Sequence, residues 1–387
     1  MSELDWILGL WQSDSGATRE AVLTTVVHVK GSAYRRPGAR MLILADGRRI
    51  GSISGGCLEG DVCRKAWWFT ENGQPSVRVY DTSSEDDAVW EFGLGCNGIV
   101  HVLFERVGDA GTAEMLRFLG EARAARRPVT VATVIAAAER GPCRVGERLL
   151  FDGRGVQGGR LAGSPVAAEV VAQVRESFAR QKNHLAHLEG CDVFVETVLP
   201  PQTLVVFGAG HDAQPLVRMA AELGWQVTVA DGRRSYATAE RFPEAARVAV
   251  IDPQEPLRGI EIDRDTAVVM MTHNFPQDAK LLPHILPRKP RYLGMLGPKS
   301  RTEDLFAEVG LPVTGIDVHA PVGLDIGSDL PEAIALSIVA EIQAFLENRS
   351  GRMLKHREGP IHDSVYESGQ RSGRLVENTE IAICDLS

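Results

Sequence analysis

A glycine-rich loop between a predicted strand and a predicted helix has the residue types that bind a phosphate. The apolar run 203–207 leads into Gly-Ala-Gly-His-Asp-Ala at 208–213, which matches the pattern G-x-G-x-x-G/A. In this pattern the first glycine makes a tight turn, the second lets a phosphate approach the backbone, and the small last residue lets helix and sheet pack closely. The helix N-terminus then presents free N–H groups to the anion. The residues expected at this phosphate site are Gly208, Gly210, His211, Asp212 and Ala213.

A carboxylate follows at the distance that nucleotide-binding folds use. Asp231 ends the next strand-like run and stands 21 residues after Gly210. An acid at this place binds the ribose 2′-hydroxyl, whereas a nearby arginine accommodates a 2′-phosphate. Arg233 and Arg234 stand beside Asp231, so the sequence leaves both ligands open. A third alternative is a loop that is kept for packing and binds nothing.

Two cysteines stand in glycine-rich turns of the first half of the chain. Cys57 follows Gly55 and Gly56, and Cys96 lies in the run Gly-Leu-Gly-Cys-Asn-Gly at 93–98. A thiol at a helix start has a lowered pKa, and thiolates bind soft metals. We therefore expect these turns to form a site for metal or sulfur chemistry. The spacing lacks the C-x-x-C pair of a zinc site, and each cysteine alone also fits a small buried residue that fills a turn.

Further polar residues follow later strand-like runs. His273 comes directly after the run 267–272, Gly297 ends the run 292–297, and Lys299 comes two residues later. Ligands of doubly wound folds bind at the carboxyl ends of the strands, so we expect these three residues to contribute to the cofactor site. The alternatives are a structural hydrogen bond for His273 and a solvated helix-start charge for Lys299.

The elements that must position these residues fall into two regions. Strands alternate with helices over 202–347, which predicts a doubly wound parallel sheet of the Rossmann type within an α/β protein. Residues 1–198 read as an α+β domain that carries the Gly-Gly-Cys turn. Residues 348–387 are polar and without periodicity, and they predict an extended tail.

The α+β domain contains a weak internal repeat. Residues 23–27 resemble 131–135, and 38–42 resemble 146–150, both at an offset of 108. We interpret the domain as two related halves. The Gly-Gly-Cys turn is found in the first half alone, so a duplicated scaffold would carry its chemistry on one copy.

Composition and charge exclude several classes of protein. The chain has 387 residues, a net charge of −9 and no basic stripe, which excludes a nucleic-acid binder. No apolar run approaches the ~20 residues of a membrane span, and the N-terminus does not resemble a signal peptide. Six cysteines are too few for a disulfide scaffold, which predicts reduced thiols in a cytoplasm. The aromatic run Trp67, Trp68 and Phe69 predicts a homodimer surface.

Together the motifs resemble the XdhC/CoxI family, the accessory proteins of molybdenum hydroxylases. The resemblance extends to about residue 348 and rests on the segments 51–60, 93–98, 206–211, 231–243, 271–278, 292–297 and 321–332. It implies a cytoplasmic protein that binds molybdenum cofactor, as molybdopterin or a dinucleotide form. It also implies delivery to an apo-enzyme such as xanthine or carbon monoxide dehydrogenase, with a cysteine desulfurase as partner. The glycine loop would hold the phosphate, and Cys57 or Cys96 would ligate the molybdenum.

Two other functions fit parts of the sequence. The glycine loop and Asp231 alone fit an NAD(P)-dependent oxidoreductase, with His273 as a proton relay. Hydride transfer would not explain two cysteines in glycine-rich turns, and no acid–base set stands beside the hydride site. The acidic charge and the polar tail fit a non-catalytic scaffold between a target enzyme and a sulfur donor.

Overall fold

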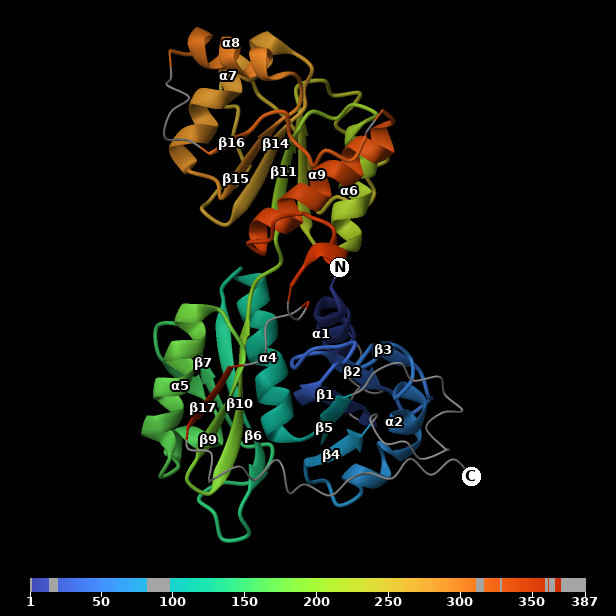
Figure 1. Cartoon of the computed structure of the whole chain (residues 1–387), viewed down its shortest axis with the longest axis vertical. Coiled ribbons are helices and arrows are strands. Elements are labelled where there is room, and N and C mark those ends of the chain that lie inside the picture. The colour runs from blue at the N-terminus through green and yellow to red at the C-terminus, as the bar shows by residue number, and fades with distance from the viewer. Residues whose placement is uncertain are drawn as a thin grey trace. The chain divides into compact units, whose positions relative to one another are not determined.

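The chain folds into two compact units. The structure, a computed structural model, describes residues 2–13, 20–81, 98–310, 317–327, 329–358, 361 and 366–369. Residues 3–200, with a strand from the C-terminal segment, form the N-terminal unit. Residues 201–361, with Ser2, form the C-terminal unit. Figure 1 shows both units, and each is described by itself.

The C-terminal unit is built on a parallel sheet. In the described part of this unit the sheet has six strands in the order β13-β12-β11-β14-β15-β16, and every pair is parallel. The strands are β11 (Thr203–Phe207), β12 (Gln226–Asp231), β13 (Arg247–Val250), β14 (Thr266–Met270), β15 (Tyr292–Met295) and β16 (Val318–His319). This is the 3-2-1-4-5-6 order of dinucleotide-binding folds, in which the crevice lies where the order reverses, here between β11 and β14. The predicted doubly wound fold is confirmed.

Helices cover both faces of this sheet, as Figure 1 shows. One face carries α6 (Ala213–Glu222) and α9 (Pro331–Leu346), and the other carries α7 (Phe275–Ile285) and α8 (Lys299–Glu308). The short helix η4 (Leu286–Arg288) extends α7, and η5 (Leu354–His356) follows α9. In β11, Leu204 and Val206 pack with the first pair of helices, whereas Val205 and Phe207 pack with the second. Both faces of the strand are thus buried, which explains its continuous apolar sequence.

The N-terminal unit contains two mainly antiparallel sheets. Among its described residues, the first sheet has the order β3-β2-β1-β5-β4 and the second sheet has the order β17-β9-β10-β6-β7-β8. The first sheet consists of β1 (Val22–Gly31), β2 (Arg40–Ile43), β3 (Arg49–Gly51), β4 (Ser76–Asp81) and β5 (Gly98–Arg106). The second sheet consists of β6 (Val129–Ala137), β7 (Arg148–Phe151), β8 (Val156–Gly158), β9 (His184–Leu188), β10 (Cys191–Val198) and β17 (Tyr366–Gly369).

The two sheets repeat one topology, which agrees with the predicted repeat. The orders 3-2-1-5-4 and 8-7-6-10-9 match strand for strand. The helix α1 (Glu3–Ser13) precedes the first copy as α4 (Ala110–Ala124) precedes the second. Between the third and fourth strands lie α2 (Glu59–Lys65) and η2 (Trp68–Thr70) in the first copy, and η3 (Arg160–Gly163) and α5 (Ala167–Arg180) in the second. Strand β17 is an addition that pairs in parallel with β9 and lies in the segment expected to be an extended tail.

Reciprocal ion pairs join the two copies. Arg40 on β2 pairs with Glu196 on β10, and its counterpart Arg148 on β7 pairs with Glu105 on β5. In each pair both side chains are at most 9% exposed. This exchange of equivalent partners is the pattern of a two-fold, isologous interface. Apolar residues from both copies, including residues of α1 and α4, also form one shared core cluster.

The aromatic run that predicted a dimer surface is mostly internal. The helix α2 ends at Lys65, and the 3₁₀ turn η2 follows at Trp68–Thr70. Phe69 is buried and Trp67 packs against the same core cluster. Of the three aromatic side chains, Trp68 alone is exposed, at 63%. The homodimer therefore stays a prediction, and only one of the three aromatic side chains, that of Trp68, is exposed to support it.

Candidate functional site

The glycine loop has the tight turn that its sequence predicts. Gly208 follows β11 with φ +121°, a conformation that other residues rarely adopt. A Cβ atom at this position would also collide with the carbonyl oxygen of Met271, at the end of the neighbouring strand β14. Ala213 begins α6 and is fully buried, so helix and sheet pack closely there. The loop thus has the form of a phosphate-binding turn at the carboxyl edge of the sheet.

Asp231, at the end of β12, is bonded to the glycine loop. Its Oδ2 accepts hydrogen bonds from the Ala209 N–H at 2.7 Å and from Arg233 Nη2 at 2.7 Å. Its Oδ1 accepts from the N–H and Nε of Arg233 at 2.8 and 3.0 Å. Burial raises the pKa of this carboxyl group, but the hydrogen bonds from Arg233 and Ala209 outweigh it, and the pKa lies below its ordinary value. The carboxylate therefore stays charged and holds the loop in place.

Cations and one aromatic ring lie beside this carboxylate. The Arg233 guanidinium is 4.0 Å from the ring centroid of Tyr236, and the Arg241 guanidinium is 5.0 Å from it. Arg241 also donates from Nη2 to the Ala209 carbonyl at 3.3 Å. The sequence did not single out Tyr236 as a site residue. The signal available was its place, with Arg241, in the segment that follows the strand-ending acid.

Two predicted site residues from different strands contact each other. The Asp212 Oδ2 atom lies 2.7 Å from Nε2 of His273. His273 has φ +55°, an uncommon conformation for a residue other than glycine. A Cβ atom on Gly210 would collide with the Asp212 carboxylate, which therefore lies against the glycine that a phosphate would approach. His211 is exposed on the same loop.

The ends of β14 and β15 add further polar groups at this edge. Asp278 is buried, accepts from the Thr272 hydroxyl at 2.6 Å, and pairs with Arg301 Nη2 at 2.8 Å. Gly297 turns the chain with φ +122°, and Lys299 is exposed at the first turn of α8. The structure thus brings Asp212 to His273 and Ala209 to Asp231, whereas Lys299 points its charge to solvent.

The Gly-Gly-Cys turn of the N-terminal unit is held by a buried carboxylate. Oε1 of Glu59 accepts from the Ser52 hydroxyl at 2.9 Å and from the Ser54 N–H at 2.8 Å, and Oε2 accepts from the Ser54 hydroxyl. The Ser54 hydroxyl in turn accepts from the Gly56 and Leu58 N–H groups, both at 3.1 Å. These bonds close the turn on both sides of Cys57. Neither serine was predicted as a site residue.

Within this turn the predicted residues differ in exposure. Gly55 lies against the ring of Tyr34, and Gly56 has φ +112°. Cys57 is half-buried against the core of the first sheet. Cys96 lies outside the residues that the structure describes. The described residues contain no cluster of three or more His, Cys, Asp or Glu side chains suited to a metal ion.

We expect Glu59 to make stability depend on acid pH. Burial raises the pKa of Glu59, but hydrogen bonds from Ser54 and Ser52 outweigh it and place the pKa below the ordinary 4.5. A carboxylate with a lowered folded-state pKa stabilises the fold above the unfolded pKa, and this stability is lost as the pH falls through the folded value. The free-energy difference between the wild type and Glu59→Gln should therefore shrink between about pH 6 and pH 3. Urea unfolding at each pH measures it; a constant difference would contradict the assignment.

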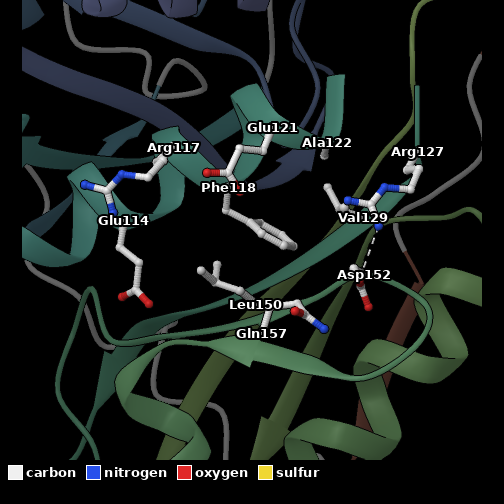
Figure 2. Close-up of a pocket in the computed structure, with 10 residues that line it drawn as sticks. All are labelled: Glu114, Arg117, Phe118, Glu121, Ala122, Arg127, Val129, Leu150, Asp152 and Gln157. Carbon is white, nitrogen blue, oxygen red and sulfur yellow. Dashed lines mark ion pairs between the residues drawn. The ribbon is translucent and has the colours of Figure 1, made fainter. Parts of the chain in front are cut away.

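A separate cleft lies in the second copy of the N-terminal unit, with a volume of about 260 Å³. Figure 2 shows Arg117 and Glu121 of α4 above it and Gln157 of β8 below. In the first copy Ile50 pairs with Leu42, whereas Gly158 takes the corresponding position in the second copy, and the Glu114 carboxylate of α4 lies against it. Among the described residues, none of the predicted site residues lines this cleft.

The fold and the site define a class: a duplicated α+β unit with a cysteine turn, joined to a Rossmann unit with a phosphate-type loop. The family model described as the XdhC Rossmann domain matches residues 204–342. The model described as the XdhC and CoxI family matches residues 16–81 and 122–189. The chain belongs to the XdhC and CoxI family, as the motifs predicted. No described helix has the length and apolar character that crossing a membrane requires.

Individual proteins agree with this membership. A Bacillus subtilis (strain 168) protein, named as a probable xanthine dehydrogenase component, is 34% identical over 324 residues, 84% of this chain and 92% of that protein. The molybdenum cofactor insertion chaperone PaoD of Escherichia coli (strain K12) is 26% identical over 331 residues, 83% of this chain and 82% of PaoD. A crystal structure described as a xanthine dehydrogenase from Bacillus halodurans is 33% identical with a TM-score of 0.74, and covers 90% of this chain and 97% of that one.

Proposed function

We propose that the chain binds molybdenum cofactor and delivers it to a molybdenum hydroxylase, such as xanthine or carbon monoxide dehydrogenase, without catalysing a reaction of its own. The observation that carries this proposal is the tight turn at Gly208, which packs against the Met271 carbonyl and leads the glycine loop directly to the start of α6. Molybdopterin ends in a phosphate, and its dinucleotide forms carry a diphosphate. The relatives named for xanthine dehydrogenase and for cofactor insertion support the same role.

We propose that residues around the turn at Gly208 contact the phosphate of the bound cofactor. An entering phosphate would approach Gly210, where the Asp212 carboxylate now lies. His273, which contacts Asp212, would then be a donor within reach of the phosphate. We propose that Arg233, Gly297 and Lys299 add to the same cofactor site. NAD(P) is a second nucleotide that this loop would accept.

We propose that the thiols act on the molybdenum end of the cofactor. The Cys57 thiol lies on a turn held by Glu59 and Ser54, and thiolate is a ligand that soft metals prefer. The Cys96 thiol is proposed as a second ligand on the sequence evidence alone. We further propose that a cysteine desulfurase donates sulfur to the cofactor, that the chain forms a homodimer, and that it is located in the cytoplasm.

The thiol assignment is tested by what the protein retains. The chain is expressed in cells that make the cofactor, and the purified protein is assayed for molybdenum and, after oxidation, for fluorescent pterin. Replacing Cys57 and Cys96 together with serine should lower retained cofactor at least about tenfold, because the metal loses its soft ligands. The control is Cys63→Ser, because burial raises the pKa of the Cys63 thiol and disfavours thiolate. If the double variant retained as much molybdenum and pterin as the wild type, the proposed role of the two thiols would be wrong.

A further inference from the structure

The carboxylate that dinucleotide folds use to bind a ribose is already occupied in this chain. Asp231 is 1% exposed, and both of its oxygens accept hydrogen bonds, from Ala209 and from three nitrogens of Arg233. A ribose diol would have to displace Arg233 to reach this carboxylate. Because hydrogen bonds between charged groups are the strong ones, that exchange is unfavourable.

The group exposed at this position is the guanidinium of Arg233, which is paired with the buried Asp231 carboxylate. The Arg233 side chain is 49% exposed. Its guanidinium packs against the ring of Tyr236, and the guanidinium of Arg241 packs against the same ring. The acids near Arg233 are Asp231, which it neutralises, and Asp212, which His273 contacts. An arginine at the end of the second strand is the group that receives a ribose 2′-phosphate in nucleotide-binding folds.

From this arrangement we infer that the C-terminal unit selects nucleotides that carry a phosphate on the ribose 2′-oxygen over nucleotides with a free 2′-hydroxyl, and that Arg233 determines this preference. The inference goes beyond molybdenum cofactor, which carries no ribose 2′-phosphate, and concerns the second nucleotide that the loop would accept. It rests on the proposed function in one respect, because it takes the glycine loop as the seat of the 5′-phosphate. It resolves the choice that Asp231 and Arg233 leave open in the sequence.

Three nucleotides that differ only in phosphate position test the inference. Calorimetric titration of the full chain measures the binding of adenosine 5′-monophosphate, adenosine 2′,5′-bisphosphate and adenosine 3′,5′-bisphosphate. The 2′,5′-bisphosphate should bind about tenfold or more tightly than the monophosphate, as one hydrogen-bonded charge pair provides. The 3′,5′-bisphosphate has the same charge and should show a smaller gain in affinity over the monophosphate. Equal affinity of the monophosphate and the 2′,5′-bisphosphate would overturn the inference. Equal affinity of the two bisphosphates would also overturn it, because the gain would then come from charge alone and not from the 2′-position.

Variants at Arg233 separate recognition from folding. In Arg233→Gln the backbone N–H of residue 233 still bonds Asp231, so the loop keeps two of its anchors. The 2′,5′-bisphosphate should lose its advantage, and the monophosphate should bind as well or better because Asp231 is freed. Arg233→Lys should keep part of the preference, because it keeps the charge without the two-pronged geometry. The matched control is Arg258→Gln, an exposed arginine of the same unit.

Failure of this inference is distinct from failure of the proposed function. A preference that survives in Arg233→Gln would overturn the role of Arg233. Binding of none of the three probes would overturn the inference together with the 5′-phosphate seat. Retention of molybdenum and pterin by the purified chain is a separate measurement, so a chain that holds the cofactor but shows no 2′-phosphate preference would refute the inference alone.

Discussion

Replacing Glu105 with glutamine should lower the free energy of unfolding of the N-terminal unit by about 3–5 kcal/mol, because it leaves a buried charge without its partner. Arg148 is 4% exposed and Glu105 is fully buried, so the guanidinium that has lost its partner cannot be solvated by water. The pair joins the two copies of the duplicated unit, and the loss should therefore weaken their interface. Urea unfolding followed by fluorescence measures it, because five of the six tryptophans lie within residues 1–200.

Two controls make this result specific to the buried pair. Glu255→Gln breaks a pair whose side chains are 62% and 75% exposed, and it should cost no more than about 1 kcal/mol. Replacing Arg148 and Glu105 together with methionine and leucine should recover most of the loss, because apolar replacements remove both charges. A cost below about 1 kcal/mol for Glu105→Gln would contradict the account of the interface.

Replacing Gly208 with alanine should both destabilise the C-terminal unit and abolish phosphate binding. A residue with a side chain pays about 1–3 kcal/mol for φ +121°, a region that glycine almost alone adopts. The added Cβ also collides with the Met271 carbonyl, so β11 and β14 must separate at the carboxyl edge. Hydrogen exchange of the amides of β11 and β14 measures the destabilisation, and retained pterin measures the loss of binding, which should exceed about tenfold.

The matched control for this variant is Gly310→Ala. Gly310 has φ +65° and open space around its Cα, so alanine there costs only the left-handed conformation, about 1–2 kcal/mol. It should leave cofactor retention at the wild-type level. If Gly208→Ala behaved like Gly310→Ala in both measurements, the turn at Gly208 would not be a phosphate seat.

The Rossmann unit could be predicted from the sequence because its signals are local. The strand β11 is a continuous apolar run, and the glycines that follow it are required by the turn itself. The repeat was also visible, because Arg40 and Arg148 stand in segments that resemble each other. Their partners Glu196 and Glu105 could not be predicted, because each lies across the interface between the copies.

The hydrogen-bond partners of the site residues could not be predicted, because they come from segments that are distant in the sequence or depend on side-chain conformation. The spacing placed Asp231 correctly, but its occupation by Arg233 and Ala209 follows from side-chain conformation at the sheet edge. The contact between Asp212 and His273 joins two loops that are 61 residues apart. The aromatic run at 67–69 suggested a surface, yet Trp67 and Phe69 pack against the core of the first sheet and Trp68 alone is exposed.

The central claim is that this chain carries molybdenum cofactor on the turn at Gly208. The most direct measurement is the molybdenum and pterin content of the full chain, purified from cells that synthesise the cofactor, beside Gly208→Ala and Gly310→Ala. The account predicts both components in near-equal amounts on the wild type and on Gly310→Ala, and neither on Gly208→Ala. Wild-type protein without pterin, or Gly208→Ala with a full complement of it, would contradict the claim.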